Sequence, residues 1–205
     1  MKNKIKIISI SGLDGSGKTT QLELLQDYLQ SRGNKIFYFH AIEFSIAQRI
    51  RRFFASKKYK KEKLKSVTSA TKNQVRLRKI AFLIDIIRFK FLLKKLEKQG
   101  YDFLLSDRFF YDNIVNICYL LHKNCPSKIE RYMPTADIAF YLRTEPTDIM
   151  KRRRVPEQGI PYLVAKKSLY DMFSSMWNLV EIDGTKSVEE IFKKISLEIR
   201  KRLAS

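Results

Sequence analysis

The stretch from Gly12 to Thr19 constrains the fold of this chain more than any other part of the sequence. It reads G-L-D-G-S-G-K-T and matches the phosphate-binding pattern G-x-x-x-x-G-K-[S/T] at every fixed position. Residues 4–10 before it are rich in β-branched apolar side chains, and Leu22, Leu25 and Leu29 after it recur at helical spacing. A strand, loop and helix in this order confirm the motif, because the glycines let backbone N–H groups turn onto phosphate oxygens and the helix N-terminus adds its positive dipole end.

The last residues of this loop carry the functional groups that a bound nucleotide needs. We expect Lys18 to reach the β- and γ-phosphates and the Thr19 hydroxyl to ligate Mg²⁺. The residues predicted to bind ATP are Gly12, Leu13, Asp14, Gly15, Ser16, Gly17, Lys18, Thr19 and Thr20.

Strand-like and helix-like segments alternate along the whole chain, which predicts a three-layer α/β fold with a five-stranded parallel sheet flanked by helices. The predicted strands are Ile5–Ile10, Lys35–His40, Tyr101–Ser106, Ile138–Leu142 and Leu179–Ile182. The predicted helices are Lys18–Ser31, Ile46–Phe54, Ile80–Lys98, Asn113–Leu121, one opening at Pro146, Leu163–Trp177 and Ser187–Arg202. With 205 residues, no repeat and no Pro/Gly linker, residues 1–205 are expected to form one domain.

A second motif, Asp107-Arg108, follows the predicted strand Tyr101–Ser106. In an open parallel sheet, ligands bind beyond the carboxyl ends of the strands, so both side chains are expected near the phosphate loop. There Asp107 could hold Mg²⁺ directly or through water, and Arg108 would point to a second anion. The alternative is a helix-capping aspartate followed by a surface arginine.

A third motif is the run Arg152-Arg153-Arg154, which opens a segment (152–162) interrupted by two prolines and a glycine. Such a segment is typical of a mobile lid, and an arginine that a closing loop delivers to a transferring phosphoryl group is worth about 10³–10⁵ in rate. The alternative is a basic helix end that the helix dipole favours.

Composition limits the partners and the compartment. The net charge of +20 favours anionic partners, although the basic residues are spread through the chain. The stretch Lys57–Lys79 is the most basic one, but it lacks the interleaved aromatic residues that stack on bases, so nucleic acid is a disfavoured partner. Two cysteines and two histidines without metal-ligand spacing argue against a Cys/His metal site. No secretory signal or membrane-spanning run is present, which predicts a cytoplasmic protein that does not enter a membrane.

The segments G-L-D-G-S-G-K-T-T and S-D-R-F-F-Y-D-N, followed by the arginine-rich lid, together resemble the thymidylate kinase family of nucleoside monophosphate kinases. The resemblance runs through essentially the whole chain. It implies a P-loop NTPase fold, transfer of the γ-phosphoryl of ATP to a deoxynucleoside monophosphate with Mg²⁺, most typically dTMP to dTDP, and a homodimer. The catalytic residues that it implies are Lys18, Asp14, Arg108, Arg152, Arg153 and Arg154.

The same resemblance implies an acceptor site. Asp14 matches the acidic residue beside the acceptor's 3′-hydroxyl, and Arg108 matches the arginine on the acceptor phosphate. Asn113 falls near the thymine ring, and Arg88 matches the arginine that contacts the base, with Phe82 or Ile84 at the stacking position. Phe109 is the usual aromatic residue after the Asp-Arg pair, and the turn Asp183–Thr185 resembles the stretch that lines adenine.

One departure from the family pattern leaves the acceptor open. Members usually carry an arginine just after the second strand that also grips the acceptor phosphate, whereas this chain has Phe39-His40-Ala41 there. A deoxynucleoside kinase with Glu43 as its base, or a kinase of broad monophosphate specificity, therefore stays an alternative. The phosphate loop also lacks an arginine, which resembles the subgroup that supplies the catalytic arginine from the lid.

Overall fold

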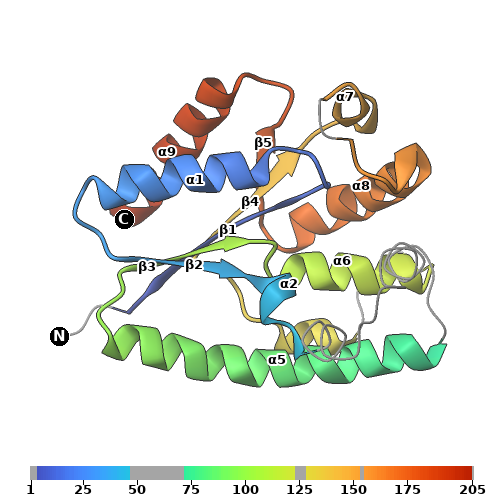
Figure 1. The fold of residues 1–205 in the computed structure, drawn as a ribbon, viewed down its shortest axis with the longest axis horizontal. Helices are drawn as coiled ribbons and strands as arrows, with labels where there is room; N and C mark the ends of the chain where they lie inside the picture. The colour runs from blue at the N-terminus through green and yellow to red at the C-terminus, as the bar shows by residue number, and fades with distance from the viewer. Residues whose placement is uncertain (1–3, 47–71, 123–127, 153–154, 205) are drawn as a thin grey trace, which may run out of the picture.

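The computed structural model describes residues 4–46, 72–122, 128–152 and 155–204. In this part of the chain the strands are β1 (Lys6–Gly12), β2 (Ile36–His40), β3 (Phe103–Asp107), β4 (Ile138–Arg143) and β5 (Val180–Asp183). The helices are α1 (Lys18–Gln30), α2 (Ala41–Phe44), α5 (Lys72–Lys98), α6 (Phe110–Leu120), the short 3₁₀ helix η1 (Lys128–Tyr132), α7 (Pro146–Met150), α8 (Gly159–Met176) and α9 (Val188–Ala204) (Figure 1).

The five strands form one parallel sheet in the order β2-β3-β1-β4-β5. The central strand is β1, where Ile8 lies opposite Leu105 of β3 on one side and Ile138 of β4 on the other. Because helices cover both faces, the inner strands are buried along nearly their whole length and read as continuous apolar runs. The carboxyl ends of all five strands therefore meet at one edge of the molecule.

Two helical layers enclose the sheet, and successive side chains of β1 point into different layers. Ile8 and Ile10 pack with the apolar faces of α1 and α9, whereas Ile7 packs with α5, α6 and α8. Figure 1 shows the long α5 along one side of the molecule, with α1 and α9 on the opposite side of the sheet. Among the helices of the described part, none combines the length and the apolar character that crossing a membrane requires.

The α/β class and the parallel five-stranded sheet are confirmed, and the differences lie at the starts of helices. Helix α5 begins at Lys72 instead of Ile80, α6 at Phe110 instead of Asn113, and α8 at Gly159 instead of Leu163. Part of the predicted lid is therefore helical. Pro161 sits in the first turn of α8, where its missing N–H would have had no partner within the helix, so this proline does not exclude helix.

The region after β2 also differs from expectation. The short helix α2 follows β2 directly, which the sequence did not predict. Beyond Ile46, the predicted helix Ile46–Phe54 lies outside the described residues. The basic stretch Lys57–Lys79 is described only from residue 72 onward, where it forms the start of α5.

Candidate active site

The phosphate loop joins the end of β1 to the start of α1, at the edge where the strands end. Gly12 has φ 145°, and a Cβ atom there would lie 2.8 Å from the carbonyl oxygen of Leu142 on the neighbouring β4. Gly17, just before α1, has φ 101°. Both positions need glycine, because a side chain would clash with β4 at the first and would strain the left-handed backbone at the second. The loop can therefore turn sharply from strand to helix.

The Lys18 side chain lies inside this loop. Its Nζ donates a hydrogen bond to the carbonyl oxygen of Leu13 at 2.6 Å and lies 3.5 Å from the Ser16 hydroxyl. The residue is only 5 % exposed, and this burial lowers the pKa of the ammonium. A buried ammonium held by loop oxygens is well placed to neutralise phosphate charge.

Thr19 and Asp107, the predicted metal-binding pair, contact each other where the phosphate loop joins α1. The Thr19 hydroxyl donates a hydrogen bond to Asp107 Oδ2 at 2.7 Å. The other carboxylate oxygen, Oδ1, is buried and has no hydrogen-bond partner among the described residues. A hydroxyl beside a buried carboxylate with a spare oxygen fits the oxygen donors that Mg²⁺ prefers. No group of three or more His, Cys, Asp or Glu side chains in the described segments is arranged to hold a metal.

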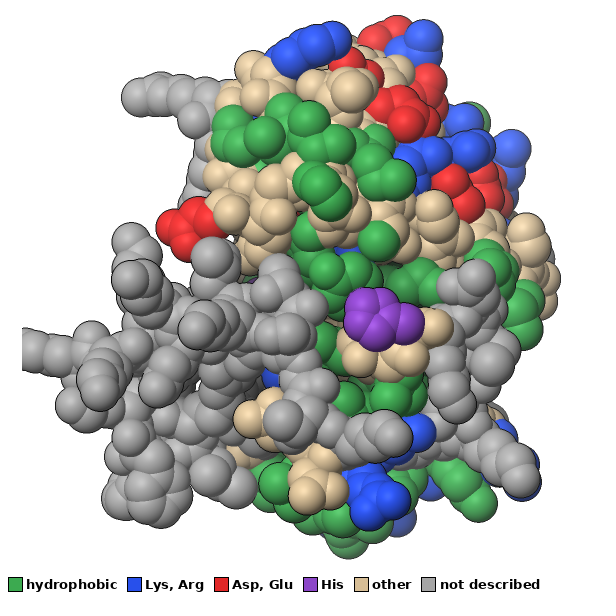
Figure 2. Space-filling model, turned by 90° about the vertical axis from the view of Figure 1, so that its right-hand side faces the viewer, with side chains coloured by type: hydrophobic (Ala, Val, Ile, Leu, Met, Phe, Trp, Pro, Cys, Tyr) green, Lys and Arg blue, Asp and Glu red, His purple; other side chains and the backbone are tan. Residues whose placement is uncertain are grey.

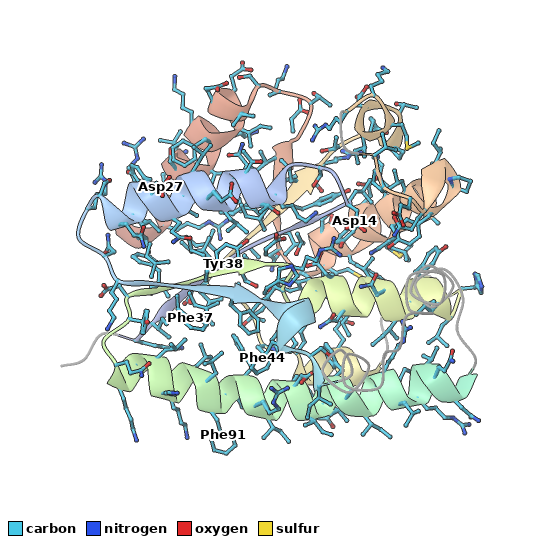
Figure 3. The ribbon with its side chains drawn as sticks, in the orientation of Figure 1. Asp14, Asp27, Phe37, Tyr38, Phe44 and Phe91 are labelled. Atoms are coloured by element: carbon cyan, nitrogen blue, oxygen red, sulfur yellow. The ribbon has the colours of Figure 1, made fainter. Side chains whose placement is uncertain are left out.

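Asp14 and Arg108 form the next contact of the site, an ion pair between the phosphate loop and the residue after β3. Figure 3 shows Asp14 at the edge where the strands end. Burial alone would raise the pKa of Asp14, but the cations Arg108, Lys166 and Lys18 hold it below its ordinary value. Burial would lower the pKa of Arg108, yet Asp14 and Asp112 raise it above the ordinary value. Both groups therefore stay charged.

The backbone at Arg108 has φ 60°, a conformation that non-glycine residues adopt rarely. This turn reverses the chain between β3 and α6 and directs the guanidinium to the phosphate loop. An unusual backbone conformation that a surrounding structure maintains is common at functional sites.

Of the predicted base-contacting residues, Arg88 and Phe82 lie on α5 and Asn113 lies on α6. Arg88 donates to Asp85 Oδ1 at 2.6 Å and to the carbonyl oxygen of Phe44 at 2.8 Å, and its guanidinium lies 4.3 Å from the centre of the Phe44 ring. Phe82 is 4 % exposed and packs edge-on against Phe110. Asn113, half-buried in the first turns of α6, lies on a different helix. Their contacts with a base stay predictions.

Arg152 is the described member of the arginine run, since Arg153 and Arg154 lie outside the described residues. Its guanidinium donates to the carbonyl oxygen of Gly15 at 2.8 Å and to that of Gly184 at 2.9 Å. Arg152 therefore links the phosphate loop to the turn Asp183–Thr185, in which the Asp183 carboxylate accepts hydrogen bonds from both the backbone N–H and the hydroxyl of Thr185.

Sequence reasoning missed a buried polar seam between α6 and α8. Asp112 accepts hydrogen bonds from Ser11 at 2.7 Å and from the Tyr170 hydroxyl at 2.6 Å. Farther along, Lys166 Nζ donates to Asn116 Oδ1 at 2.6 Å. An aspartate in the apolar run of α6 was the one available signal, because the partners are distant in sequence.

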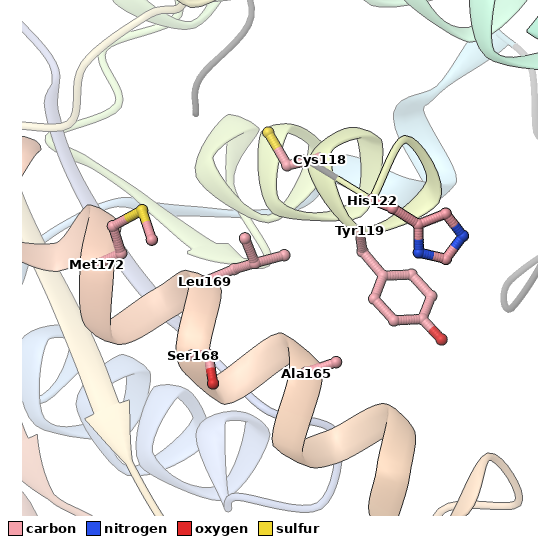
Figure 4. A pocket seen from close by; sticks show the side chains of 7 residues that line it. All are labelled: Cys118, Tyr119, His122, Ala165, Ser168, Leu169 and Met172. Atoms are coloured by element: carbon pink, nitrogen blue, oxygen red, sulfur yellow. The ribbon is translucent and has the colours of Figure 1, made fainter. Parts of the chain in front are cut away.

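A surface hollow of about 280 Å³ lies on the other side of this seam. Figure 4 shows that its lining comes from α6, the residues just after it, and α8. The lining residues are Cys118, Tyr119, His122, Ala165, Ser168, Leu169 and Met172. None of the predicted site residues is among them, so the hollow does not mark the nucleotide site.

Comparisons with known proteins identify one family. The family profile for thymidylate kinase matches residues 10–195. The thymidylate kinase of Thermosipho africanus is 28% identical over 217 aligned positions, which cover 97% of this chain and 99% of that protein. The thymidylate kinase of Plasmodium falciparum is 26% identical, with 98% and 92% covered.

Solved structures show the same fold. The thymidylate kinase of Candida albicans superposes with a TM-score of 0.67 at 16% identity, covering 97% of this chain and 93% of that one. The enzyme of Ehrlichia chaffeensis gives a TM-score of 0.63 at 16% identity, with 97% and 99% covered. The chain therefore belongs to the thymidylate kinase family of ATP-dependent phosphotransferases, which convert dTMP to dTDP.

Proposed function

We propose that the edge formed by the phosphate loop, Asp107 and Arg108 transfers the γ-phosphoryl of ATP to the phosphate of dTMP. The observation that carries this assignment is the Asp14–Arg108 ion pair. Asp14 belongs to the loop that would bind the donor phosphates, whereas Arg108 lies outside that loop and is free to serve the acceptor. The ion pair would therefore hold the donor and acceptor anions side by side. Holding two reactants in line converts a bimolecular step into an effectively unimolecular one.

Each group has a separate task in this scheme. Lys18 binds the β- and γ-phosphates through its buried ammonium. Arg108 binds the acceptor phosphate, and Asp14 orients Arg108 and lies beside the acceptor sugar. Arg152, Arg153 or Arg154 neutralises the moving phosphoryl group when the lid closes, which also excludes water and hence hydrolysis.

Thr19 and Asp107 would hold Mg²⁺, which when bound neutralises charge on the donor phosphates. The spare oxygen of Asp107 supports this assignment. No strong general base is needed, because the acceptor phosphate has a second pKa near 6 and is already largely ionised at neutral pH.

A coupled ADP-release assay with ATP and Mg²⁺ tests the acceptor directly. The acceptors to compare are dTMP, dUMP, dCMP, dGMP, dAMP and thymidine. We expect dTMP to give the highest kcat/KM. A preference for thymidine would contradict the proposal and favour a nucleoside kinase that uses Glu43, whose side chain lies outside the described part. Equal use of several monophosphates would indicate broad specificity.

We also propose that two copies of the chain pair through α5. Exposed apolar side chains on this helix follow one another at intervals of three and four residues. They are Leu77, Ile80, Ile84, Ile87 and Phe91. Figure 3 shows Phe91 pointing away from the body of the molecule, and 67 % of its surface is exposed. This spacing forms an apolar stripe along α5 that the same helix of a second copy can cover.

A further inference from the structure

Lys166 is a buried cation that the proposed mechanism does not use. It lies on α8 and is only 3 % exposed, and among the described residues it donates a hydrogen bond to the neutral side-chain oxygen of Asn116 at 2.6 Å. No carboxylate of the described residues lies within salt-bridge distance of its Nζ. A buried ammonium without a carboxylate partner is costly, so a stable fold gains little from lysine at this position.

The walls of the seam offer this ammonium aromatic contacts but no ion pair among the described residues. The rings of Tyr162 and Tyr170 lie 5.4 and 5.7 Å from Nζ, within the range of cation–π attraction. Asp112, the nearest carboxylate of the seam, already accepts hydrogen bonds from Ser11 and Tyr170. The hydrogen-bonding capacity of the ammonium beyond Asn116 is therefore available to a ligand.

Lys166 lies near the phosphate-loop end of the seam. Its Nζ is 5.7 Å from the Tyr170 ring, the Tyr170 hydroxyl donates to Asp112, and Asp112 also accepts a hydrogen bond from Ser11 beside the phosphate loop. Burial lowers the pKa of Lys166, while Asp14 raises it and Arg108 lowers it. Asp14 in turn is stabilised as a carboxylate by Arg108 and, next, by Lys166. Lys166 and Arg108 thus approach the same carboxylate from α8 and from the start of α6.

The charge balance at this point leaves room for one more cation. Asp14 and Arg108 neutralise each other as an ion pair. Ala41, after β2, is buried and uncharged. A phosphate monoester carries a charge of about −1.5 to −2 at neutral pH, which one already paired arginine does not balance. We propose that Lys166 is the second cation that binds the acceptor's phosphate, by exchanging its hydrogen bond to Asn116 for one to a phosphate oxygen.

This inference rests on the proposed function, since it assigns a further residue to the same acceptor site. The variant Lys166→Met tests this assignment separately from the proposed function, because methionine keeps the approximate length of the side chain and removes the charge. Lys167→Met is the matched control, because the neighbouring Lys167 pairs with Asp171 and Glu145. The measurements are calorimetric titrations with dTMP and with thymidine, steady-state kinetics and thermal melting.

We expect Lys166→Met to weaken dTMP binding and raise its KM by roughly tenfold to a hundredfold, the loss expected for a hydrogen bond between charged groups. Thymidine binding and the KM for ATP should stay at the wild-type level. The Tm should be equal or higher, because the buried charge is gone. Lys167→Met should leave dTMP binding unchanged.

Equal losses for dTMP and thymidine, or unchanged dTMP binding, would overturn the assignment. If Lys166→Met fails to fold, Asn116→Asp replaces it, because the new carboxylate would pair with the ammonium and keep it from phosphate. Unchanged dTMP binding in Asn116→Asp would equally overturn the inference. Failure of the wild-type enzyme to phosphorylate dTMP would instead refute the proposed function, and the two titrations would still test the phosphate contact.

Discussion

Arg108 combines a strained backbone with a side chain fixed by an ion pair. The left-handed conformation at φ 60° costs a non-glycine residue about 1–2 kcal/mol. The ion pair with Asp14 and the reversal between β3 and α6 require this conformation. Stability and function therefore make opposite demands on the residue at this position.

Two substitutions of Arg108 separate those demands. Arg108→Ala should raise the KM for dTMP about tenfold to a hundredfold and leave the KM for ATP nearly unchanged, because a charged contact to the acceptor is lost. Arg108→Gly should give the same kinetic defect with a stability about 1 kcal/mol higher than that of Arg108→Ala, since glycine accepts positive φ. Initial rates and urea unfolding measure both. A change confined to the KM for ATP would show that Arg108 serves the donor.

Lys18→Ala should lower kcat by about 10²–10³, the range seen when one preorganised electrostatic stabiliser is removed. The fold should remain intact, because a buried ammonium is replaced by a small apolar group. Single-turnover rates and circular-dichroism melting check this, with the exposed Lys193→Ala as control. A turnover rate close to that of the wild type in Lys18→Ala would refute the mechanism.

At the scale of elements, the sequence predicted what is local and missed what depends on packing. The inner strands β3 and β4, on either side of β1, are covered by helices on both faces, so their apolar runs stand out. The phosphate loop is a contiguous motif. The start of α6 was misplaced because Phe110 is set by contacts with Phe82 and Phe89 and not by a capping residue. The contact between Lys166 and Asn116 exists only once α6 and α8 pack together.

The proposed metal site, Thr19 and Asp107, lies where α1 and β3 meet. Asp107→Asn keeps the shape of the side chain but removes the charge, so the Mg²⁺ concentration for half-maximal activity should rise at least about tenfold. Titration of activity with Mg²⁺ measures this, with Glu23→Gln on the exposed face of α1 as control. Wild-type enzyme should lose activity in excess EDTA. Full activity in EDTA would refute the metal assignment.

The segment between α7 and α8 carries the lid prediction. Among Arg152→Ala, Arg153→Ala and Arg154→Ala, at least one should lower kcat more than KM, because its contact forms only in the transition state. Arg152→Ala should in addition raise the KM for ATP, since Arg152 links the carbonyl groups of Gly15 and Gly184. Three variants with unchanged kcat would exclude a catalytic role for this run.

At the scale of the whole molecule, exposed apolar side chains gather in particular regions of the described surface. Figure 2 looks onto the end where the strands finish, and hydrophobic side chains gather over its upper part. Val155, Ile160 and Val164, before and within the first turns of α8, contribute exposed apolar surface of the described chain. The larger apolar surface lies on α5 and is the one that the proposed dimer would cover.

Ile87→Glu tests the proposed dimer, because it places a charge in the middle of the apolar stripe of α5. Light scattering coupled to size-exclusion chromatography should show a dimer for the wild type and a monomer for the variant. Glu97→Gln, at a half-buried position of the same helix outside this apolar run, serves as control and should stay dimeric. A wild-type chain that is monomeric at tens of micromolar would contradict the proposal.

The central position of β1 has a consequence for the chain during its synthesis. The partners of β1 begin at Phe103 and Ile138, so the ribosome adds about a hundred residues before the first of them exists. If synthesis adds about 5–20 residues per second, roughly 5–20 s pass between the synthesis of β1 and that of β3, and a longer time passes before β4 is made. During that interval the nascent chain carries an apolar strand with no neighbour to bind, so chains arrested before β4 should be protease-sensitive and should recruit chaperones.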